Sequence, residues 1–377
     1  MSIETKGATP GQVLTRRNFI QVAAALGLAA PVAGAIADKI GFPMTASAAE
    51  KVALSMAVFA GGRNPVIPKR VVAEYIAAHP EASIEVIESS NAALYPQMRA
   101  AQQANPDKPL VNIGYYNTAS SFQGDADDMW ESLDPARIPN MNNILPNLRR
   151  PDNKGAAPVL SPIGIVYNKD KMATPPKSWV ELFTDPALRG RIVGTDYGWA
   201  FNGLLQAVMV HGGDVRKPEA GFKFIADNAK QYLTLAAGGS QIINLFGSGE
   251  AWICIQSRSF QNNLINSGIN AGFVIPDEGA ILQPIFLQIV KGTSPEQRAV
   301  AEAIINILLS PEIVSEYVAG EAYTPAISGV SIPAELADDP ALKPDVADKA
   351  LKVDWAAMAE VDSDYREMWD QQVKTQL

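Results

Sequence analysis

Short hydrophobic segments alternate with amphipathic segments along most of the chain after residue 51. Short apolar runs bounded by turn residues are typical of buried strands, whereas apolar residues spaced three and four apart are typical of helices. Before residue 158, this pattern predicts strands at 52–58, 84–87 and 110–113, and helices over about 68–79 and 94–104. Strands that alternate with helices of this length favour a parallel sheet with helices on its faces.

The same alternation begins again after the proline-rich segment 151–158. Further strands are predicted at 163–167, 191–194, 232–235, 251–255, 272–275 and 285–290, and further helices at 179–183, 201–210, 219–230, 241–246, after Arg258, at 295–309 and from 311 to 320. We interpret the chain as two α/β lobes with boundaries near residues 158 and 280.

In this interpretation lobe 1 is discontinuous, with residues 49–158 and 280–330, and lobe 2 is residues 159–279. The remaining residues, 331–377, are expected to be a wrapping loop and helices that pack on the lobes. Trp355, Met358, Tyr365 and Trp369 are the apolar residues of this last helical segment.

The first 48 residues have the pattern of an export signal. Arg16 and Arg17 precede an uncharged, Ala- and Gly-rich run from 22 to 37, and the small residues 46–48 fit the site that a signal peptidase reads. We predict a twin-arginine signal that is cleaved near Ala48, and a periplasmic mature protein. The alternatives are an ordinary secretory signal and an uncleaved anchor, although 19–37 is short of the about 20 strongly apolar residues that a membrane span needs.

Composition narrows the possible chemistry. The 377 residues include one cysteine and two histidines, which argues against disulfide frameworks, Cys/His zinc sites and most His-centred catalysis. The net charge is −9, and it becomes −11 when the leader, with four Lys or Arg and two Asp or Glu, is removed. No block of Lys and Arg is present to follow a phosphate backbone, so nucleic acid is not an expected partner.

Three residues with reactive side chains have structural interpretations. Cys254 lies in an apolar strand-like stretch and is expected to be a small buried hydrophobe. His79 and His211 precede Pro80 and two glycines, and both are interpreted as helix-termination features. No cofactor or metal ion is expected.

Several motifs occur in an order that resembles a known family. They are Pro-Ile-Gly-Ile-Val-Tyr-Asn-Lys-Asp at 162–170, Pro-Pro-Lys-Ser-Trp-Val-Glu-Leu-Phe at 175–183, Leu-Arg-Gly-Arg-Ile at 188–192, Gly-Ser-Gly-Glu-Ala-Trp at 247–252 and Ala-Tyr-Thr-Pro at 322–325. Together they resemble the extracellular solute-binding proteins of ABC importers, and most of all the spermidine/putrescine branch. Individually these motifs define the scaffold, and they support the fold more than the function.

The resemblance implies a type 2 periplasmic binding protein fold, with a ligand cleft between two lobes that are joined by two crossing segments. It implies capture of a small solute by lobe closure and delivery to an ABC permease in the inner membrane, by a protein that we expect to be monomeric and not an enzyme. A binding protein that reports its ligand to a sensor instead of a permease would have the same sequence features.

The ligand is less clear from the resemblance. Asp196 matches one carboxylate of the polyamine-binding relatives, but Trp199 stands at the neighbouring acidic position, and Ile255, Gln283 and Ile285 stand at later tryptophan and aspartate positions. Most of the polyamine pocket is therefore missing from this chain.

Ligands of open α/β sheets bind beyond the carboxyl ends of strands, and this rule gives an independent set of candidates. These ligand-binding candidates are Phe59, Arg63, Tyr115, Tyr116, Asp196, Tyr197, Trp199, Gln256, Arg258, Gln283 and Tyr323. Each also has a structural interpretation: a solvated loop charge for Arg63, packing inside lobe 1 for the two adjacent tyrosines, a helix cap for Asp196, core packing for Trp199 and a surface ion pair for Arg258.

A guanidinium group from Arg63 or Arg258 in the cleft would suit a carboxylate, because it offers a planar fork of donors. With Asp196 on the opposite side, an amino-acid-like zwitterion or an organic acid is the favoured ligand. The alternatives are a polyamine, a ferric ion bound by the phenolates of Tyr115 and Tyr116, and a periplasmic enzyme, for which the sequence has no nucleophile-elbow, dinucleotide-binding or Walker motif.

Overall fold

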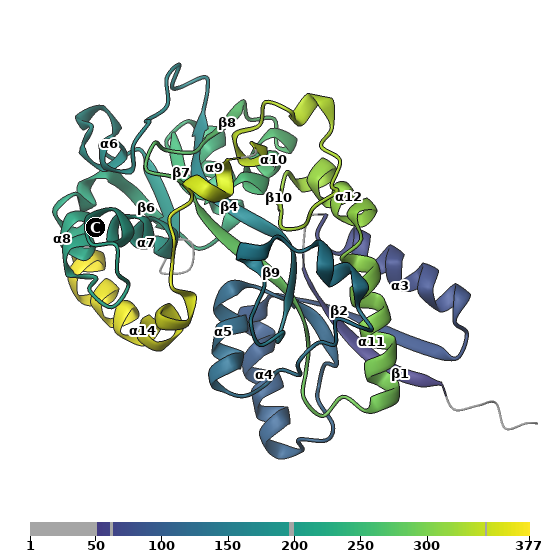
Figure 1. The fold of residues 1–377 in the computed structure, drawn as a ribbon. Coiled ribbons are helices and arrows are strands. Elements are labelled where there is room, and N and C mark those ends of the chain that lie inside the picture. Colours follow the sequence, from purple (N-terminus) through teal and green to yellow (C-terminus); the bar gives the residue numbers. More distant parts are fainter. Residues whose placement is uncertain (1–50, 61–62, 196–199, 344) are drawn as a thin grey trace, which may run out of the picture. The chain divides into compact units, whose positions relative to one another are not determined.

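The computed structural model describes residues 51–60, 63–195, 200–343 and 345–377. These residues form one mixed β-sheet with helices around it (Figure 1). Its strand order is β2-β1-β3-β9-β4-β7-β5-β6, and β8 and β10 also pair with β4. The strands are β1 (Val52–Phe59), β2 (Ala82–Ser89), β3 (Ile113–Tyr116), β4 (Ala156–Asn168), β5 (Ile192–Thr195), β6 (Tyr232–Ala236), β7 (Ile253–Ser257), β8 (Ala271–Val274), β9 (Ile281–Ile289) and β10 (Thr324–Pro325).

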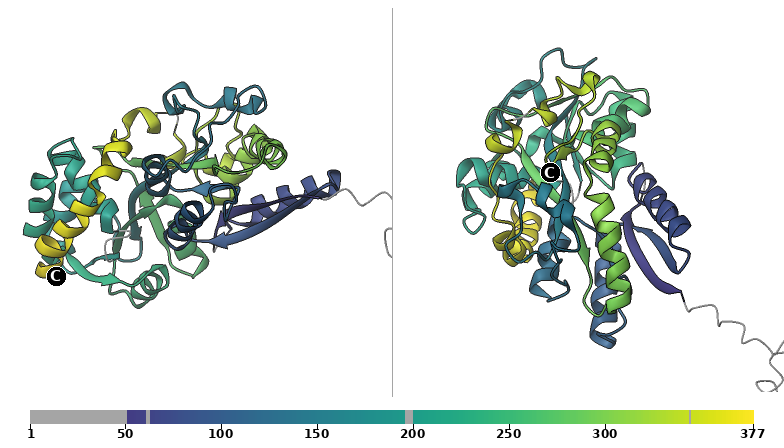
Figure 2. Two further views of the ribbon diagram at one scale, coloured as in Figure 1. Left: turned by 90° about the horizontal axis from the view of Figure 1, so that it is seen from below. Right: turned by 45° about the vertical axis from the view of Figure 1, so that its right-hand side comes forward.

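Helices precede or follow most strands. They are α3 (Val66–Ala78), α4 (Asn91–Ala104), α5 (Thr118–Ala126), α6 (Trp179–Thr184), α7 (Ala200–His211), α8 (Glu219–Asp227), α9 (Gly239–Ser248), α10 (Arg258–Asn266), α11 (Pro295–Leu308), α12 (Pro311–Glu321), α13 (Val346–Lys349) and α14 (Trp355–Met368). Helix α11 packs against α3, as the views in Figure 2 show.

Strand directions correct the prediction of a parallel sheet. β1 is parallel to β3, and β5 is parallel to β6 and β7, as expected for strands that alternate with helices. However, β9 is antiparallel to β3 and β4, and β4 is antiparallel to β7 and β8. β9 returns from a distant part of the chain, so its direction is not fixed by the local alternation of strands and helices.

The long strand β4 takes part in two sets of pairings. Residues 156–163 pair with β9, whereas residues 163–167 pair with β7 and residues 165–168 with β8. The predicted boundary near residue 158 falls inside this strand, and the boundary near 280 falls just before β9. β9 and β4 are therefore the strands that join the β2-β1-β3 part of the sheet to the β7-β5-β6 part.

Most predicted elements are present, with shifted ends. β3 begins at Ile113, where the predicted strand at 110–113 ends, and β4 begins seven residues before the predicted strand at 163–167. The prolines at 158 and 162 hide the first half of β4 in the sequence, and a register shift between Ala156 and Val159 accommodates this irregular segment. Helix α5, at 118–126, was not predicted.

The motif at 175–183 forms a capped helix. The Ser178 hydroxyl accepts hydrogen bonds from the backbone N–H groups of Val180 and Glu181, as an N-cap residue does. Trp179 and Leu182 then point into the core, and the Trp179 indole N–H donates to the Gly279 carbonyl over 2.9 Å. The motif is thus part of the scaffold, as its residues indicate.

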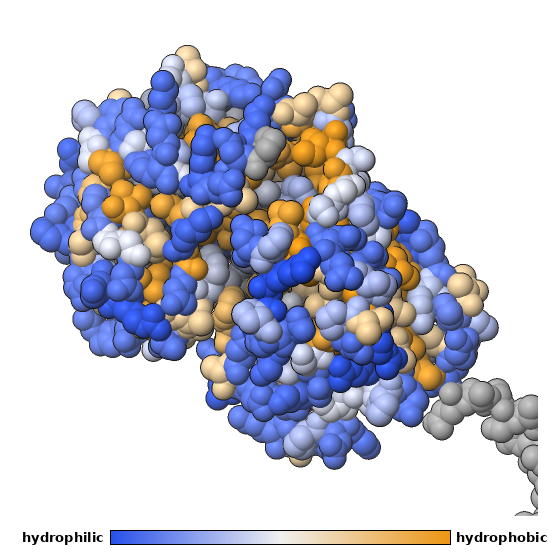
Figure 3. Space-filling model, viewed as in Figure 1, coloured by the Kyte–Doolittle hydropathy of each residue, from blue (hydrophilic) through white to orange (hydrophobic). Residues whose placement is uncertain are grey.

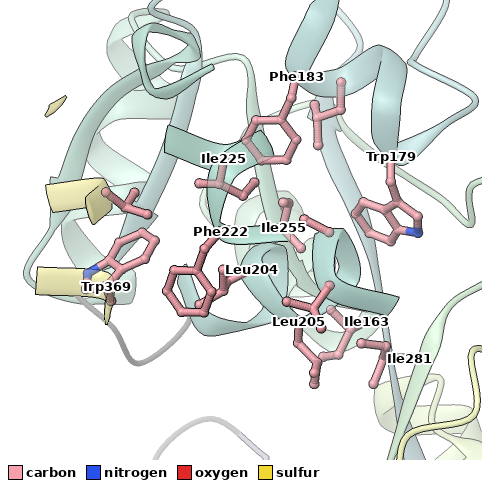
Figure 4. Packing of buried hydrophobic residues seen from close by; sticks show 14 of the residues in the cluster. Ile163, Trp179, Phe183, Leu204, Leu205, Phe222, Ile225, Ile255, Ile281 and Trp369 are labelled. Carbon is pink, nitrogen blue, oxygen red and sulfur yellow. The ribbon is translucent and has the colours of Figure 1, made fainter. Parts of the chain in front are cut away.

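A large hydrophobic cluster joins the C-terminal segment to α7 and α8. Trp369, which follows α14, lies beside Phe222 of α8, and Leu204 of α7 lies next to Phe222 (Figure 4). The Tyr365 hydroxyl donates to the Val215 carbonyl over 2.8 Å. The last helix, which was expected to pack on a lobe, thus packs against α7 and α8.

Three sequence interpretations of single residues are also confirmed. Cys254 is buried, and burial raises the pKa of its thiol. His79 is the C-cap residue of α3 and stacks on Tyr75, and His211 ends α7. These side chains belong to the framework of the fold.

The predicted export signal lies outside the described residues. None of the helices that the described residues form is both long and apolar enough to cross a membrane. On the face seen in Figure 3, hydrophilic residues cover most of the surface, and hydrophobic residues form several smaller patches, some of them toward the middle of the view.

Candidate functional site

A polar cavity of about 700 Å³ lies beside the loop that follows β1. Arg63 and Asn64 come from this loop, and Glu321 is the last residue of α12. The start of α9 and one side of α10 complete the lining with hydroxyl and amide groups, from Ser240, Ser259, Asn262, Asn263 and Asn266. The cavity thus combines one positive charge, one negative charge and several neutral hydrogen-bonding groups.

The two charges in this cavity are close enough to influence each other. Burial raises the pKa of the Glu321 carboxyl, and the positive charge of Arg63 partly opposes that rise. Within the part of the chain that the structure describes, neither side chain forms an ion pair within 4.0 Å. Both groups therefore retain capacity to bind a ligand of opposite charge.

A second cavity of about 500 Å³ adjoins the first, because both are lined by Ala60 and Asn64. Its walls are the ends of β1 and β2, the starts of α4 and α5, and the middle of β4 and β9. Phe59 and Gln283, two of the predicted ligand-binding residues, line this cavity, and Arg63 lines the first. We call the two together the candidate cleft.

Hydrogen bonds between loops hold the second cavity in shape. The Asn91 amide donates to the Tyr115 carbonyl over 3.1 Å and accepts from the Asn117 backbone N–H over 2.7 Å, which joins the starts of α4 and α5. The Thr118 hydroxyl donates to the Pro284 carbonyl over 2.9 Å and joins α5 to β9. These side chains are buried, so the wall is formed before any ligand binds.

Tyr323 is close to the candidate cleft but lines neither cavity. Its ring is buried against Tyr317, and its hydroxyl donates to the Asn64 side chain over 3.2 Å. Asn64 lines both cavities. Tyr323 therefore supports a wall residue of the candidate cleft.

The adjacent tyrosines 115 and 116 lie inside β3, and not in the loop after the strand as predicted. Successive side chains of a strand point to opposite faces. The Tyr115 hydroxyl lies 2.9 Å from that of Tyr317, whereas the Tyr116 hydroxyl contacts the Met98 sulfur in a cluster that includes Trp130. Neither tyrosine lines the candidate cleft, and both pack inside the protein, as in the structural interpretation of this pair.

This arrangement also removes the basis of the ferric-ion hypothesis. Two phenolates on opposite faces of a strand cannot bind one ion, and burial raises the pKa of both tyrosines. Among the described residues, no group of three or more His, Cys, Asp or Glu side chains is placed to hold a metal ion.

Arg258 is used in the scaffold. It is the first residue of α10, and its guanidinium pairs with Asp339 over 2.6 Å and donates to Asn262 over 2.9 Å. The side chains of Arg258 and Asp339 are only 9% and 7% exposed, so this is a buried ion pair and not the surface pair that was considered. It ties the loop before α13 to α10, and Arg258 lines neither cavity.

Gln256 is also buried, at 1% exposure, within β7 and not beyond its end. The predicted strand at 251–255 ends two residues too early, which placed Gln256 in a loop. Asp196, Tyr197 and Trp199 lie outside the described residues.

Several cleft residues were not predicted. Asn91 follows β2, and the strand-end rule, which was used after the first and third strands, would have found it after the second. Glu321 ends a helix, and Trp355 begins α14 far along the chain, yet both line the candidate cleft. No signal in the sequence connects these two residues to the strand ends.

The family comparison matches the description "Bacterial extracellular solute-binding protein" over residues 70–344. The match covers more than half of the chain, so this protein belongs to the family of bacterial extracellular solute-binding proteins. The resemblance that the sequence motifs suggest is confirmed. The comparison with curated protein sequences gave no match.

Solved structures agree with this assignment. An ABC transporter structure from Clostridium perfringens is 22% identical, with a TM-score of 0.70, and covers 85% of this chain and 99% of its own. The spermidine/putrescine ABC transporter substrate-binding protein of Streptococcus pneumoniae is 18% identical, with a TM-score of 0.68, over 86% of this chain and 99% of its own. A GABA receptor is 17% identical, with a TM-score of 0.68, over 85% and 97%. The chain has the two-lobe α/β fold of periplasmic binding proteins.

Proposed function

We propose that this protein is the periplasmic substrate-binding component of an ABC importer and that it captures an amino-acid-like zwitterion in the candidate cleft. The observation that carries the proposal is the presence of Arg63 and Glu321 in one polar cavity. A guanidinium group binds a carboxylate through paired hydrogen bonds, and a carboxylate binds an ammonium group. A zwitterion satisfies both charges at once.

The predicted roles change in two respects. We assign the carboxylate-binding role to Arg63 rather than to Arg258, because the Arg258 guanidinium already pairs with Asp339 and Asn262. Glu321 supplies a carboxylate that does not depend on Asp196. Among the compared structures, one is a GABA receptor, and GABA is an amino acid.

Lobe closure is part of the proposal. We assign the two crossing segments to β4 and β9, because β4 pairs with β9 along its first half and with β7 and β8 along its second. Ligand contacts on both sides of these strands would stabilise the closed state, and the closed state would dock on the permease. We propose transport rather than catalysis as the activity.

The test is isothermal titration calorimetry of the exported protein against a panel of amino acids, organic acids, polyamines and sugars. We expect micromolar or tighter binding of one or more amino acids. Arg63→Gln and Glu321→Gln should each weaken that binding about tenfold or more, because each removes a charged protein group that would hydrogen-bond to the ligand. Lys223→Gln and Glu335→Gln, at exposed positions outside both cavities, should leave it unchanged.

Binding of a polyamine, a sugar or an organic acid in place of every amino acid would overturn the proposal. So would amino-acid binding that neither Arg63→Gln nor Glu321→Gln weakens.

A further inference from the structure

The second cavity of the candidate cleft differs in chemistry from the first. Its lining, in the part of the chain that the structure describes, includes no Asp, Glu, Lys or Arg side chain. Its apolar lining consists of Phe59, Trp355, Ile285, Pro284 and alanines at the starts of α4 and α5, and neutral Ser, Thr, Asn and Gln side chains complete the wall. A charged group would lose hydration there without an opposite charge to pair with, whereas an apolar group would be favourably buried against the aromatic and aliphatic side chains.

Trp355 reaches this cavity from the C-terminal segment. It is the first residue of α14, and the Asp354 carboxylate caps this helix by accepting from the Ala357 backbone N–H over 3.0 Å. Asp354 also pairs with Arg216 over 3.4 Å. Farther along α14, Tyr365 is fully buried in the cluster shown in part in Figure 4, so the helix that carries Trp355 is firmly anchored.

The indole of Trp355 differs from those of three other tryptophans. Trp130, Trp179 and Trp252 each donate the indole N–H to a backbone carbonyl, over 2.8, 2.9 and 3.1 Å. Trp355 makes no such bond to any residue in the described ranges, and its side chain is half-buried at the cavity. The Trp355 ring packs in part against the hydrophobic cluster around α7 and α8, which fixes its position, and it also lines the second cavity, where it is available for a ligand.

We infer that the ligand is an amino acid with a large apolar or aromatic side chain, and that Trp355 is a specificity-determining residue that contacts this side chain. This inference rests on the proposed function. The charged head group binds beside Arg63 and Glu321, and the side chain extends past Asn64 into the second cavity. There it lies among Phe59, Ile285 and Trp355.

The shape of the second cavity is preformed, which favours one size of side chain over others. The hydrogen bonds of Asn91 and Thr118 fix its wall before binding. A small side chain would leave the space between Phe59 and Trp355 unfilled and would lose the contacts that a larger side chain makes. Selectivity between amino acids is therefore expected to arise in this cavity and not at the charged head group.

The experiment compares glycine, L-alanine, L-leucine and L-phenylalanine by calorimetry on the exported protein and on Trp355→Ala, Trp355→Phe and Trp252→Phe. We expect wild type to bind phenylalanine or leucine at least about tenfold more tightly than alanine. Trp355→Ala should reduce that preference about tenfold, with little change in the affinity for glycine. Trp252→Phe, at a tryptophan outside the candidate cleft, should keep the wild-type preference.

Fluorescence provides a second readout in case Trp355→Ala fails to fold. Binding of phenylalanine should change the intrinsic fluorescence of wild type and of Trp252→Phe, and this change should be lost or much reduced in Trp355→Phe. Equal affinity for glycine and phenylalanine, with no effect of any Trp355 substitution, would overturn the inference and leave the proposed function standing. Failure of every amino acid to bind would overturn the proposed function itself.

Discussion

Glu321 is a carboxylate whose ionisation depends on its surroundings in the candidate cleft. Burial raises its pKa above the ordinary value of 4.5, and Arg63 lowers it. Because the folded pKa is raised, the ionised form is disfavoured by folding, and protonation on acidification begins at a higher pH than for an ordinary glutamate. A ligand ammonium group would supply a positively charged partner for this carboxylate.

We predict that Arg63→Gln raises the pKa of Glu321 further, because it removes the nearby positive charge. Affinity for an amino acid should also fall as the pH is lowered through the Glu321 pKa, since the protonated carboxyl no longer pairs with ammonium. Carbon NMR of protein with isotope-labelled glutamate would measure the titration. Lys223→Gln is the matched control, and a Glu321 pKa that is unchanged by Arg63→Gln would contradict the account.

Gln206 is a buried polar side chain outside the candidate cleft. It lies in α7 with no exposed surface, and neither atom of its side-chain amide has a hydrogen-bond partner within the described residues. A buried polar group without a partner costs about 1–3 kcal/mol. This cost identifies Gln206 as a weak point of the core.

We predict that Gln206→Met raises the free energy of unfolding by about 1 kcal/mol, because methionine fills similar space without polar atoms. The control is Gln231→Met, since the Gln231 amide donates to the Asp185 carbonyl over 2.7 Å and its loss should destabilise the protein. Urea unfolding of the two variants measures both effects. Destabilisation by Gln206→Met comparable to that by Gln231→Met would show that the Gln206 amide is satisfied.

At the scale of elements, α14 joins the candidate cleft to the hydrophobic cluster around α7 and α8. Its N-cap Asp354 has a pKa below the ordinary value of 3.8, mainly because its carboxylate accepts the Ala357 N–H, and also because of Arg216. With a lowered folded pKa, the stabilisation is present above about pH 3.8 and is lost as the pH falls through the lowered value. The start of α14, and with it Trp355, is expected to loosen only in acid.

Substitution of this cap tests the role of α14. Asp354→Ala should lower the free energy of unfolding by about 1 kcal/mol, whereas Asp354→Asn should cost much less, because asparagine is also a good N-cap residue. Asp354→Ala should also weaken the binding of phenylalanine by displacing Trp355. Equal unfolding midpoints in urea for wild type and Asp354→Ala would show that the cap does not stabilise the helix.

Element types were predicted better than element ends, and the ends determined which candidate residues lie in the candidate cleft. The apolar run at 110–113 marks the existence of β3, but its continuation through Tyr116 depends on pairing with Phe286 of β9, about 170 residues later in the chain. Tyr115 and Tyr116 were placed beyond the strand for this reason. Phe59 and Arg63 line the candidate cleft at the end of β1, which lies within one residue of its predicted end, whereas Gln283 lines it from inside β9, which begins four residues before the predicted strand.

For the whole molecule, the motif series was sufficient to identify the family, and the alternation of strands and helices was sufficient to predict an α/β fold. The mixed direction of the sheet and the contributions of Glu321 and Trp355 to the cleft were beyond the sequence, because they arise from contacts between distant segments. The net charge of −9 likewise says little about the ligand, since a single Arg63 and a single Glu321 set the charge of the polar cavity.

The most direct test of the proposed function is to identify the solute that the protein carries. Protein purified without denaturation from cells that export it would be unfolded in acid, and the released small molecules would be analysed by mass spectrometry. The account predicts an amino acid, and in particular one with a large apolar side chain. Release of a polyamine, a sugar or a sugar phosphate in stoichiometric amount, with no amino acid, would contradict it.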